Sequence, residues 1–295
     1  GLPATGSGNI TPFNAVNATN TSVSATITVT PTAAGCQGVP KTFTITINPT
    51  PGLIQPANQA LCNNVTTNSI AFIGTMGGTT YAWANNNTSI GLPASGSGNI
   101  AAFLAINTTN VAEVAAITVT PSAMGCAGLP QSFTITVNPT PSVVQPPNQS
   151  LCNGIVTNAI AFNGPVSGTT FTWTNTAPLI GLQASGSGNI PAFTATGNGF
   201  STSVATITVR PTALGCVGPT KTFTITINPI TNVIQPPDQA LCNGASTNLV
   251  TFTGGMNNIP SYNWTNNNPS IGLAATGTGN IASFKALNTT SAPVT

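Results

Sequence analysis

Short runs in which apolar and polar residues alternate recur along the whole chain. Between Thr50 and Pro139 they lie at residues 53–55, 69–73, 80–84, 100–106, 114–120 and 132–137. Alternation with a period of two is typical of a β-strand that buries one face. Clusters of Asn, Gly, Pro and Ser separate the runs, and no segment combines a 3.6-residue period with helix caps. We therefore predict an all-β fold with few helices.

The order of these runs repeats along the chain. Two series of cysteines are each spaced 90 residues apart: Cys36, Cys126 and Cys216, and Cys62, Cys152 and Cys242. The block GLPATGSGNI at residues 1–10 returns in near-identical form at residues 91, 181 and 272. The last step is one residue longer, which indicates an insertion between Thr253 and Asn263. About seven strands per repeat is the rhythm of an immunoglobulin-like β-sandwich, so we predict tandem sandwiches of about 90 residues.

Proline-rich phrases mark the junctions between repeats, because proline breaks strand pairing and stiffens a linker. They lie at residues 48–51 and 138–141, and a third at residues 228–231 keeps one proline. The predicted domains are the C-terminal part of a first repeat at 1–49, complete sandwiches at 50–139 and 140–229, and the N-terminal part of a further repeat at 230–295. We expect the chain to be an excerpt of a longer array, in which neither terminal part closes a core alone.

Ionisable side chains are nearly absent. The chain has four Lys or Arg, two acids and no His: Lys41, Arg210, Lys221, Lys285, Glu113 and Asp238. A nucleophilic Ser or Cys would therefore have no base, and no carboxylate pair exists for glycoside hydrolysis. Calcium and zinc sites lack ligands, and a net charge of +2 makes no nucleic-acid patch. We predict no enzyme, no cofactor, no metal and no nucleic-acid partner.

The sequence also argues against two structural features, an isopeptide crosslink and a membrane-spanning segment. The repeat at 50–139 has no lysine, so we expect no Lys–Asn isopeptide crosslink in it. No run approaches 18 apolar residues, so no segment is predicted to span a membrane.

Each repeat has one tryptophan, which stands two residues after another aromatic: Trp83, Trp173 and Trp264. A core tryptophan on a central strand and an exposed platform that stacks a ligand both explain this pattern, and the polar neighbours favour the core. The Gly-rich phrase from Gly96 to Gly98 could suggest a phosphate loop. No helix follows it and no lysine adjoins it, so a hairpin or bulge is expected.

Together these motifs resemble a known type of repeat. They are the Cys-Asn pairs, the aromatic-x-Trp strand, the Gly-Leu-x-Ala block and the Gly-Cys-x-Gly turn that leads to a Phe-Thr-Ile-Thr strand. They are similar to the PKD-like and Ig-like tandem repeats of giant surface proteins of Bacteroidota, among them gliding-motility adhesins exported by type 9 secretion. The Trp-Asp-Phe-Gly-Asp signature of PKD domains proper is missing here. The resemblance implies an export-sorting domain and an adhesive tip outside this chain.

The cysteines are predicted to form structural disulfides, since they recur at two places without metal partners. Pairing within a domain would join Cys62 to Cys126 and Cys152 to Cys216, and would leave Cys36 and Cys242 with partners outside the excerpt. The competing prediction, Cys62–Cys216, joins one domain to the next.

We expect an extracellular stalk or adhesin filament on the bacterial cell surface, which extends an adhesive or motility-related tip. Each sandwich would advance the filament by roughly 35–45 Å. Other copies of the repeat are the expected partners, in the same chain or in filament neighbours, and surface glycans or substrata would be bound by regions not present here. Two alternatives stay open: repeats that each bind a glycan or protein, and a polymer of subunits completed by neighbouring strands.

Overall fold

The computed structural model describes residues 1–199, 201–254 and 261–295, and their regular structure is β-strands and three single 3₁₀ turns. None of the helical turns in these ranges is long or apolar enough to cross a membrane. The predicted insertion between Thr253 and Asn263 falls mostly on residues 255–260, which are outside the described residues. The all-β prediction is confirmed.

Contacts divide the chain into two compact units. The first contains residues 1–142, 164–169 and 212–218, and the second contains residues 143–163, 170–211 and 219–295. The boundary therefore does not follow the repeats, because two short pieces, 164–169 and 212–218, belong with the repeat that precedes them in the sequence.

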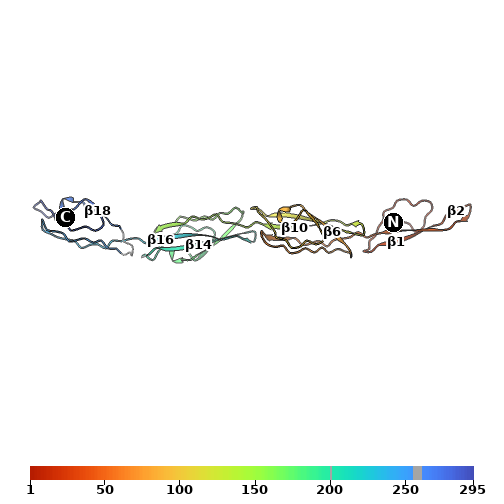
Figure 1. Ribbon diagram of the computed structural model, residues 1–295, viewed down its shortest axis with the longest axis horizontal. Coiled ribbons are helices and arrows are strands. Elements are labelled where there is room, and N and C mark those ends of the chain that lie inside the picture. Colours follow the sequence, from red (N-terminus) through yellow and green to blue (C-terminus); the bar gives the residue numbers. More distant parts are fainter. Residues whose placement is uncertain (200, 255–260) are drawn as a thin grey trace. The chain divides into compact units, whose positions relative to one another are not determined.

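The repeat at 50–139, in which Figure 1 labels β6 and β10, is built on one large sheet. Its strand order is β5-β10-β8-β6-β7, and β9 pairs with the end of β8. The antiparallel pair β8–β10 sets Ile117 opposite Phe133, whereas β5 runs parallel to β10. The strands are β5 Gln59–Cys62, β6 Thr80–Asn85, β7 Ser95–Ser97, β8 Glu113–Ala123, β9 Cys126–Ala127 and β10 Gln131–Asn138.

The repeat at 140–229 has the same sheet, in the order β11-β16-β14-β12-β13 with β15 on β14. Its register is also the same, because Ile207 lies opposite Phe223. The strands are β11 Gln149–Cys152, β12 Thr170–Asn175, β13 Ser185–Ser187, β14 Ser203–Ala213, β15 Cys216–Val217 and β16 Lys221–Asn228. The 3₁₀ turns η1 Thr88–Ile90, η2 Pro178–Ile180 and η3 Pro269–Ile271 follow corresponding strands in three repeats.

Alternate residues of the two central strands fill the core of each complete repeat. On β8 the buried side chains are Ala115, Ile117 and Val119, and on β10 they are Phe133, Ile135 and Val137. Their intervening neighbours are mostly threonines that are half-exposed. The period of two seen in the sequence is therefore the division between core and solvent in a β-sandwich.

The second layer is less regular than the sequence predicts. The runs at 53–55, 69–73 and 100–106 form single bridges in place of strands, such as the bridge between Ile70 and Ile100. Side chains replace the next backbone rungs: Asn99 Oδ1 accepts the N–H of Phe72 and Thr67 Oγ1 accepts the N–H of Phe103. The backbone groups are satisfied, but without a continuous ladder.

Each terminal part contains half of this architecture. Residues 1–49 form the antiparallel hairpin β1–β4 with Ile27 opposite Phe43, in the same register as the central hairpin of the complete repeats. Its strands are β1 Val23–Val29, β2 Thr32–Ala33, β3 Cys36–Gln37 and β4 Lys41–Ile47. The strands β17 Asn263–Thr265 and β18 Thr276–Thr278 lie in the other terminal part. Phe43 is 45% exposed where Phe133 is 2% exposed, so this apolar face has no core to cover it.

Candidate functional site

A two-residue turn closes the hairpin at the end of each long central strand. Between β8 and β9 the turn residues Met124 and Gly125 have φ of 51° and 77°, and between β14 and β15 Leu214 and Gly215 have 51° and 77°. Positive φ at both central residues is the tight hairpin turn that matches the twist of its strands. A left-handed conformation costs a non-glycine residue roughly 1–2 kcal/mol. Met124 and Leu214 therefore adopt an energetically unfavourable backbone conformation, and this conformation orients their carbonyl groups.

Those carbonyl groups accept hydrogen bonds from the repeat before them. The Asn48 side-chain amide donates to the carbonyl of Met124 at 2.9 Å, and the Asn138 amide donates to that of Leu214 at 3.0 Å. All four residues belong to the first compact unit. The same contact thus occurs twice, 90 residues apart, and joins the end of one repeat's last strand to the hairpin of the next. We call this contact, a hairpin tip held by the asparagine of the preceding repeat, the latch.

A disulfide reinforces the second latch. Cys62, at the end of β5, is bonded to Cys216 of β15 with an S–S distance of 1.97 Å. The predicted pairs Cys62–Cys126 and Cys152–Cys216 are therefore wrong, and the competing pair is the one present. Among the described cysteines, Cys36, Cys126, Cys152 and Cys242 are free thiols.

Strand direction explains the correction. Cys62 is paired with Asn138 at the last residue of β10, whereas Cys126 lies on the arm of β8 that continues past the first residue of β10, Gln131. The eight residues of β10 separate these two ends by about 26 Å. A disulfide needs Cα atoms within about 7 Å, so the two cysteines of one repeat cannot meet.

The single glutamate of the chain offers a direct test of this pairing. A glutamate-specific protease cuts the denatured, unreduced monomer once, after Glu113. The cut places Cys62 in one fragment and both of its predicted partners, Cys126 and Cys216, in the other. We expect the two fragments of the wild type and of Cys126→Ser to stay linked on non-reducing gels. The fragments of Cys216→Ser should separate. Separation in Cys126→Ser, with linkage in Cys216→Ser, would restore the pairing within one repeat.

The three tryptophans do not form a binding platform. Trp83 and Trp173 are 8% and 6% exposed and belong to the two cores, and Trp264 is half-buried in the terminal part. The indole N–H of each is buried without a hydrogen-bond partner among the described residues. The tryptophans therefore contribute apolar area to the core.

The sequence reading missed the role of the Gly-rich phrase. A Cβ at Gly96 would lie 2.1 Å from Cζ2 of Trp83, and one at Gly186 would lie 2.2 Å from Cζ2 of Trp173. These glycines stand opposite the tryptophans across the β6–β7 and β12–β13 pairs. The glycines of this segment leave room for the indole ring, which packs directly against them. The constant Trp-to-Gly spacing was the signal in the sequence that could have revealed it.

Buried asparagines were also missed. Asn107 is 3% exposed, and its amide donates to the carbonyls of Val111 and Val137 at 2.7 Å each. Asn85 is buried in the same repeat and donates to the carbonyl of Leu92 at 2.9 Å. These side chains satisfy carbonyl groups of loops and, at Val137, of the end of strand β10. No group of three or more His, Cys, Asp or Glu that could hold a metal occurs in residues 1–199, 201–254 and 261–295.

Comparison with known proteins agrees with this architecture. Residues 59–141 match the PKD-like domain. This match, together with the strand order described above, supports Ig-like and PKD-like repeats in the chain. Domains of this type are typical of extracellular and adhesion proteins, and their fold is generally non-catalytic. No curated protein matches the chain in sequence.

Several solved structures are similar to this chain at low sequence identity. An E-to-A mutated variant of three Ig domains of titin is 10% identical, over 72% of this chain and 77% of that one, with a TM-score of 0.45. The IG1+IG2 structure of DIP-gamma is 10% identical, over 61% and 97%, with a TM-score of 0.37. The EC1-4 structure of Drosophila N-cadherin is 13% identical, over 64% and 52%, with a TM-score of 0.37.

Proposed function

We propose that this chain is a spacer segment of an extracellular filament, which holds an adhesive or motility-related tip away from a bacterial surface. The observation that carries the proposal is the latch. It ties the hairpins of the repeats at 50–139 and 140–229 to the repeat before each, in the same way at Asn48 and Asn138. A joint that repeats with the period of the sequence is what a regular array requires, because identical joints generate identical steps.

The repeats at 50–139 and 140–229 are the proposed structural units, with 1–49 and 230–295 as parts of further ones. A disulfide between repeats suits an oxidising, extracellular setting and resists separation of neighbours under load. A net charge of +2 over 295 residues gives weak long-range electrostatics, which suits a spacer better than a receptor that steers charged ligands. The tryptophans of the two complete repeats, Trp83 and Trp173, are buried and so are not available to stack on a glycan, which favours the spacer over a row of non-catalytic binding modules.

Deleting whole repeats separates a spacer from a binding module. Removal of two repeats, 50–229, from the filament in the cell should shorten it by about 70–90 Å while most surface attachment and motility remain. Filament length is measured by electron microscopy, and display by antibody labelling. A loss of attachment by filaments that are still folded and displayed would show that the repeats themselves bind the ligand.

A further inference from the structure

The disulfide between Cys62 and Cys216 closes a large loop of the chain. The two cysteines are 154 residues apart in the sequence, but their Cα atoms are 5.6 Å apart. The loop contains β6 to β10 of the repeat at 50–139 and β11 to β14 of the repeat at 140–229. Most of both sandwiches, including the two central strands of the first core, therefore lies between the two cysteines.

Tension along the chain has a shorter covalent path than this loop. A pull on the first complete repeat enters at Thr50, follows β5 to Cys62 and can cross directly to Cys216. From there it follows β15 and β16 and leaves the second complete repeat at Pro229. The shorter path becomes taut first, because the longer path has far more contour length between the same two points. The residues of the loop are then not stretched.

The shorter path has little slack. We call it the tie: residues 50–62 and residues 216–229, joined by the disulfide. β16, Lys221–Asn228, makes up most of the second arm, and β5 forms the end of the first. A strand already rises about 3.2–3.4 Å per residue against a maximum of about 3.3–3.6 Å, so pulling lengthens it very little. In the rest of the first arm, Pro51 and Pro56 each fix one backbone dihedral.

Hydrogen bonds fasten the chain immediately after Cys62. Asn63 Oδ1 accepts the N–H of Asn107 at 2.8 Å. The backbone N–H of Asn63 donates to the carbonyl of Asn138 at the end of β10, also at 2.8 Å, and its side-chain amide donates to Thr140 Oγ1 at 3.2 Å. Cys62 is therefore held in place at the point where the load passes from the backbone to the disulfide.

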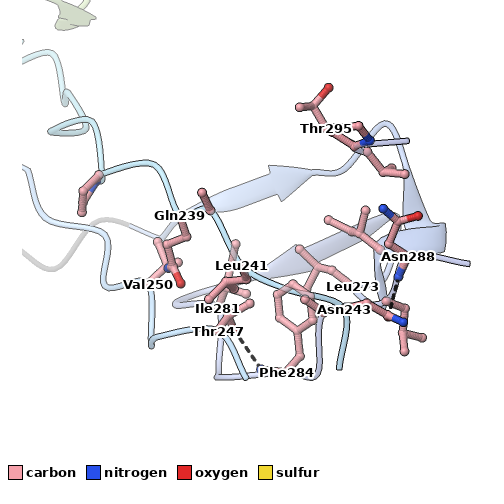
Figure 2. A pocket seen from close by; sticks show the side chains of 17 residues that line it. Gln239, Leu241, Asn243, Thr247, Val250, Leu273, Ile281, Phe284, Asn288 and Thr295 are labelled. Atoms are coloured by element: carbon pink, nitrogen blue, oxygen red, sulfur yellow. Dashed lines mark hydrogen bonds between the residues drawn. The ribbon is translucent and has the colours of Figure 1, made fainter. Parts of the chain in front are cut away.

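The other two repeats that contain this cysteine fasten the following residue in the same way. Asn153 Oδ1 accepts the N–H of Gly197 at 2.8 Å. Asn243 Oδ1 accepts the N–H of Asn288 at 2.9 Å, as Figure 2 shows. The position of the cysteine is therefore set by the fold of each repeat and does not depend on the disulfide.

The second anchor of the tie is the hairpin that carries Cys216. The latch holds this hairpin, because the carbonyl of Leu214 accepts the amide of Asn138 at 3.0 Å. Cys216 itself is 1% exposed, so its sulfur is shielded from solvent. The latch and the disulfide thus join the same end of one repeat to the same hairpin of the next. Under load the hydrogen bond would separate first, and the covalent bond beside it prevents that separation.

We propose that the tie is a load-bearing bypass, which carries tension past the cores of the two complete repeats so that neither sandwich is pulled open. Without the disulfide, the pull would act between the first and last strands of the first complete repeat. Those strands, β5 and β10, are paired over only four residues. The inference rests on the proposed filament function, which supplies the tension, and it explains how a spacer would keep a constant length.

Stretching single molecules of the purified 295-residue chain between its two ends tests the bypass. Opening one 90-residue repeat lengthens the chain by roughly 250–290 Å, which is its extended length minus that of a folded sandwich. At forces below those that break covalent bonds, we expect the oxidised chain to show no step of this size. Cys216→Ser should show two such steps, one for each complete repeat. The two terminal parts should contribute the same extension to every variant.

Cys126→Ser is the matched control, because Cys126 is the hairpin cysteine of the repeat at 50–139 and is a free thiol. It should behave as the wild type does. If Cys216→Ser does not fold, the wild type reduced after folding gives the same comparison. Two steps in the oxidised wild type would show that the load reaches the cores. No steps in the reduced wild type would show that the fold alone resists the load. Either result would overturn the proposal.

The pulling experiment and the repeat deletion test different claims. A chain without a bypass could still set the distance between a surface and a tip, so two steps in the oxidised chain would leave the spacer function standing. Loss of attachment after removal of residues 50–229 would instead contradict the spacer function, and the pulling result of the purified chain would be unchanged.

Discussion

Replacing Gly96 by alanine should unfold the repeat at 50–139 at a much lower temperature. The new methyl group would lie 2.1 Å from Cζ2 of Trp83, far inside van der Waals contact. The ring is buried in the core, so the clash is relieved only if the ring or the sheet shifts. Overpacking of this severity should cost about 3 kcal/mol. For a domain of this size that lowers the melting temperature by roughly 12–24 °C.

The measurement is thermal unfolding followed by tryptophan fluorescence, since each repeat has one tryptophan. The matched control is Gly77→Ala in the same repeat, where an added Cβ meets nothing within 4 Å. Gly186→Ala, opposite Trp173, should reproduce the effect in the next repeat. If Gly96→Ala and Gly77→Ala had the same melting temperature, the close packing of Gly96 against Trp83 would have no importance for stability.

Replacing Phe133 by alanine should destabilise the same repeat by about 3–5 kcal/mol. Phe133 is 2% exposed and packs against Phe72, with ring centroids 6.4 Å apart. The variant removes a buried ring from the centre of the core and leaves a cavity. The free energy of unfolding from denaturant titration gives the value.

Phe43 is the control for this substitution, because it occupies the same register position on a hairpin without a core. Phe43→Ala should change the stability of the complete repeats by less than about 0.5 kcal/mol. A large loss in this variant would mean that the terminal hairpin is already part of a closed core in the single chain.

Some predictions depended only on local pattern, and the structure agrees with them. The alternation of Ile117 and Val119 with threonines predicted a strand with one buried face, and β8 is that strand. The runs at 69–73 and 100–106 carry the same kind of signal but form single bridges. The difference lies in Asn99 and Thr67. Their side chains accept hydrogen bonds from backbone N–H groups that would be bonded to carbonyl groups in a continuous strand pair. No count of apolar residues reveals that competition.

The sequence by itself determined the all-β class, the repeat of 90 residues and the near-absence of ionisable chemistry, because strand periodicity, self-similarity and composition are properties of the chain alone. Only the tertiary structure decided the partner of Cys62. Cysteines at fixed sequence spacing are close in space only if the strands that carry them end on the same side of the sheet. The parallel pairing of β5 with β10 puts Cys62 at one end and the hairpin with Cys126 at the other. The antiparallel pairing of β6 with β7 likewise decided that Gly96 lies opposite Trp83.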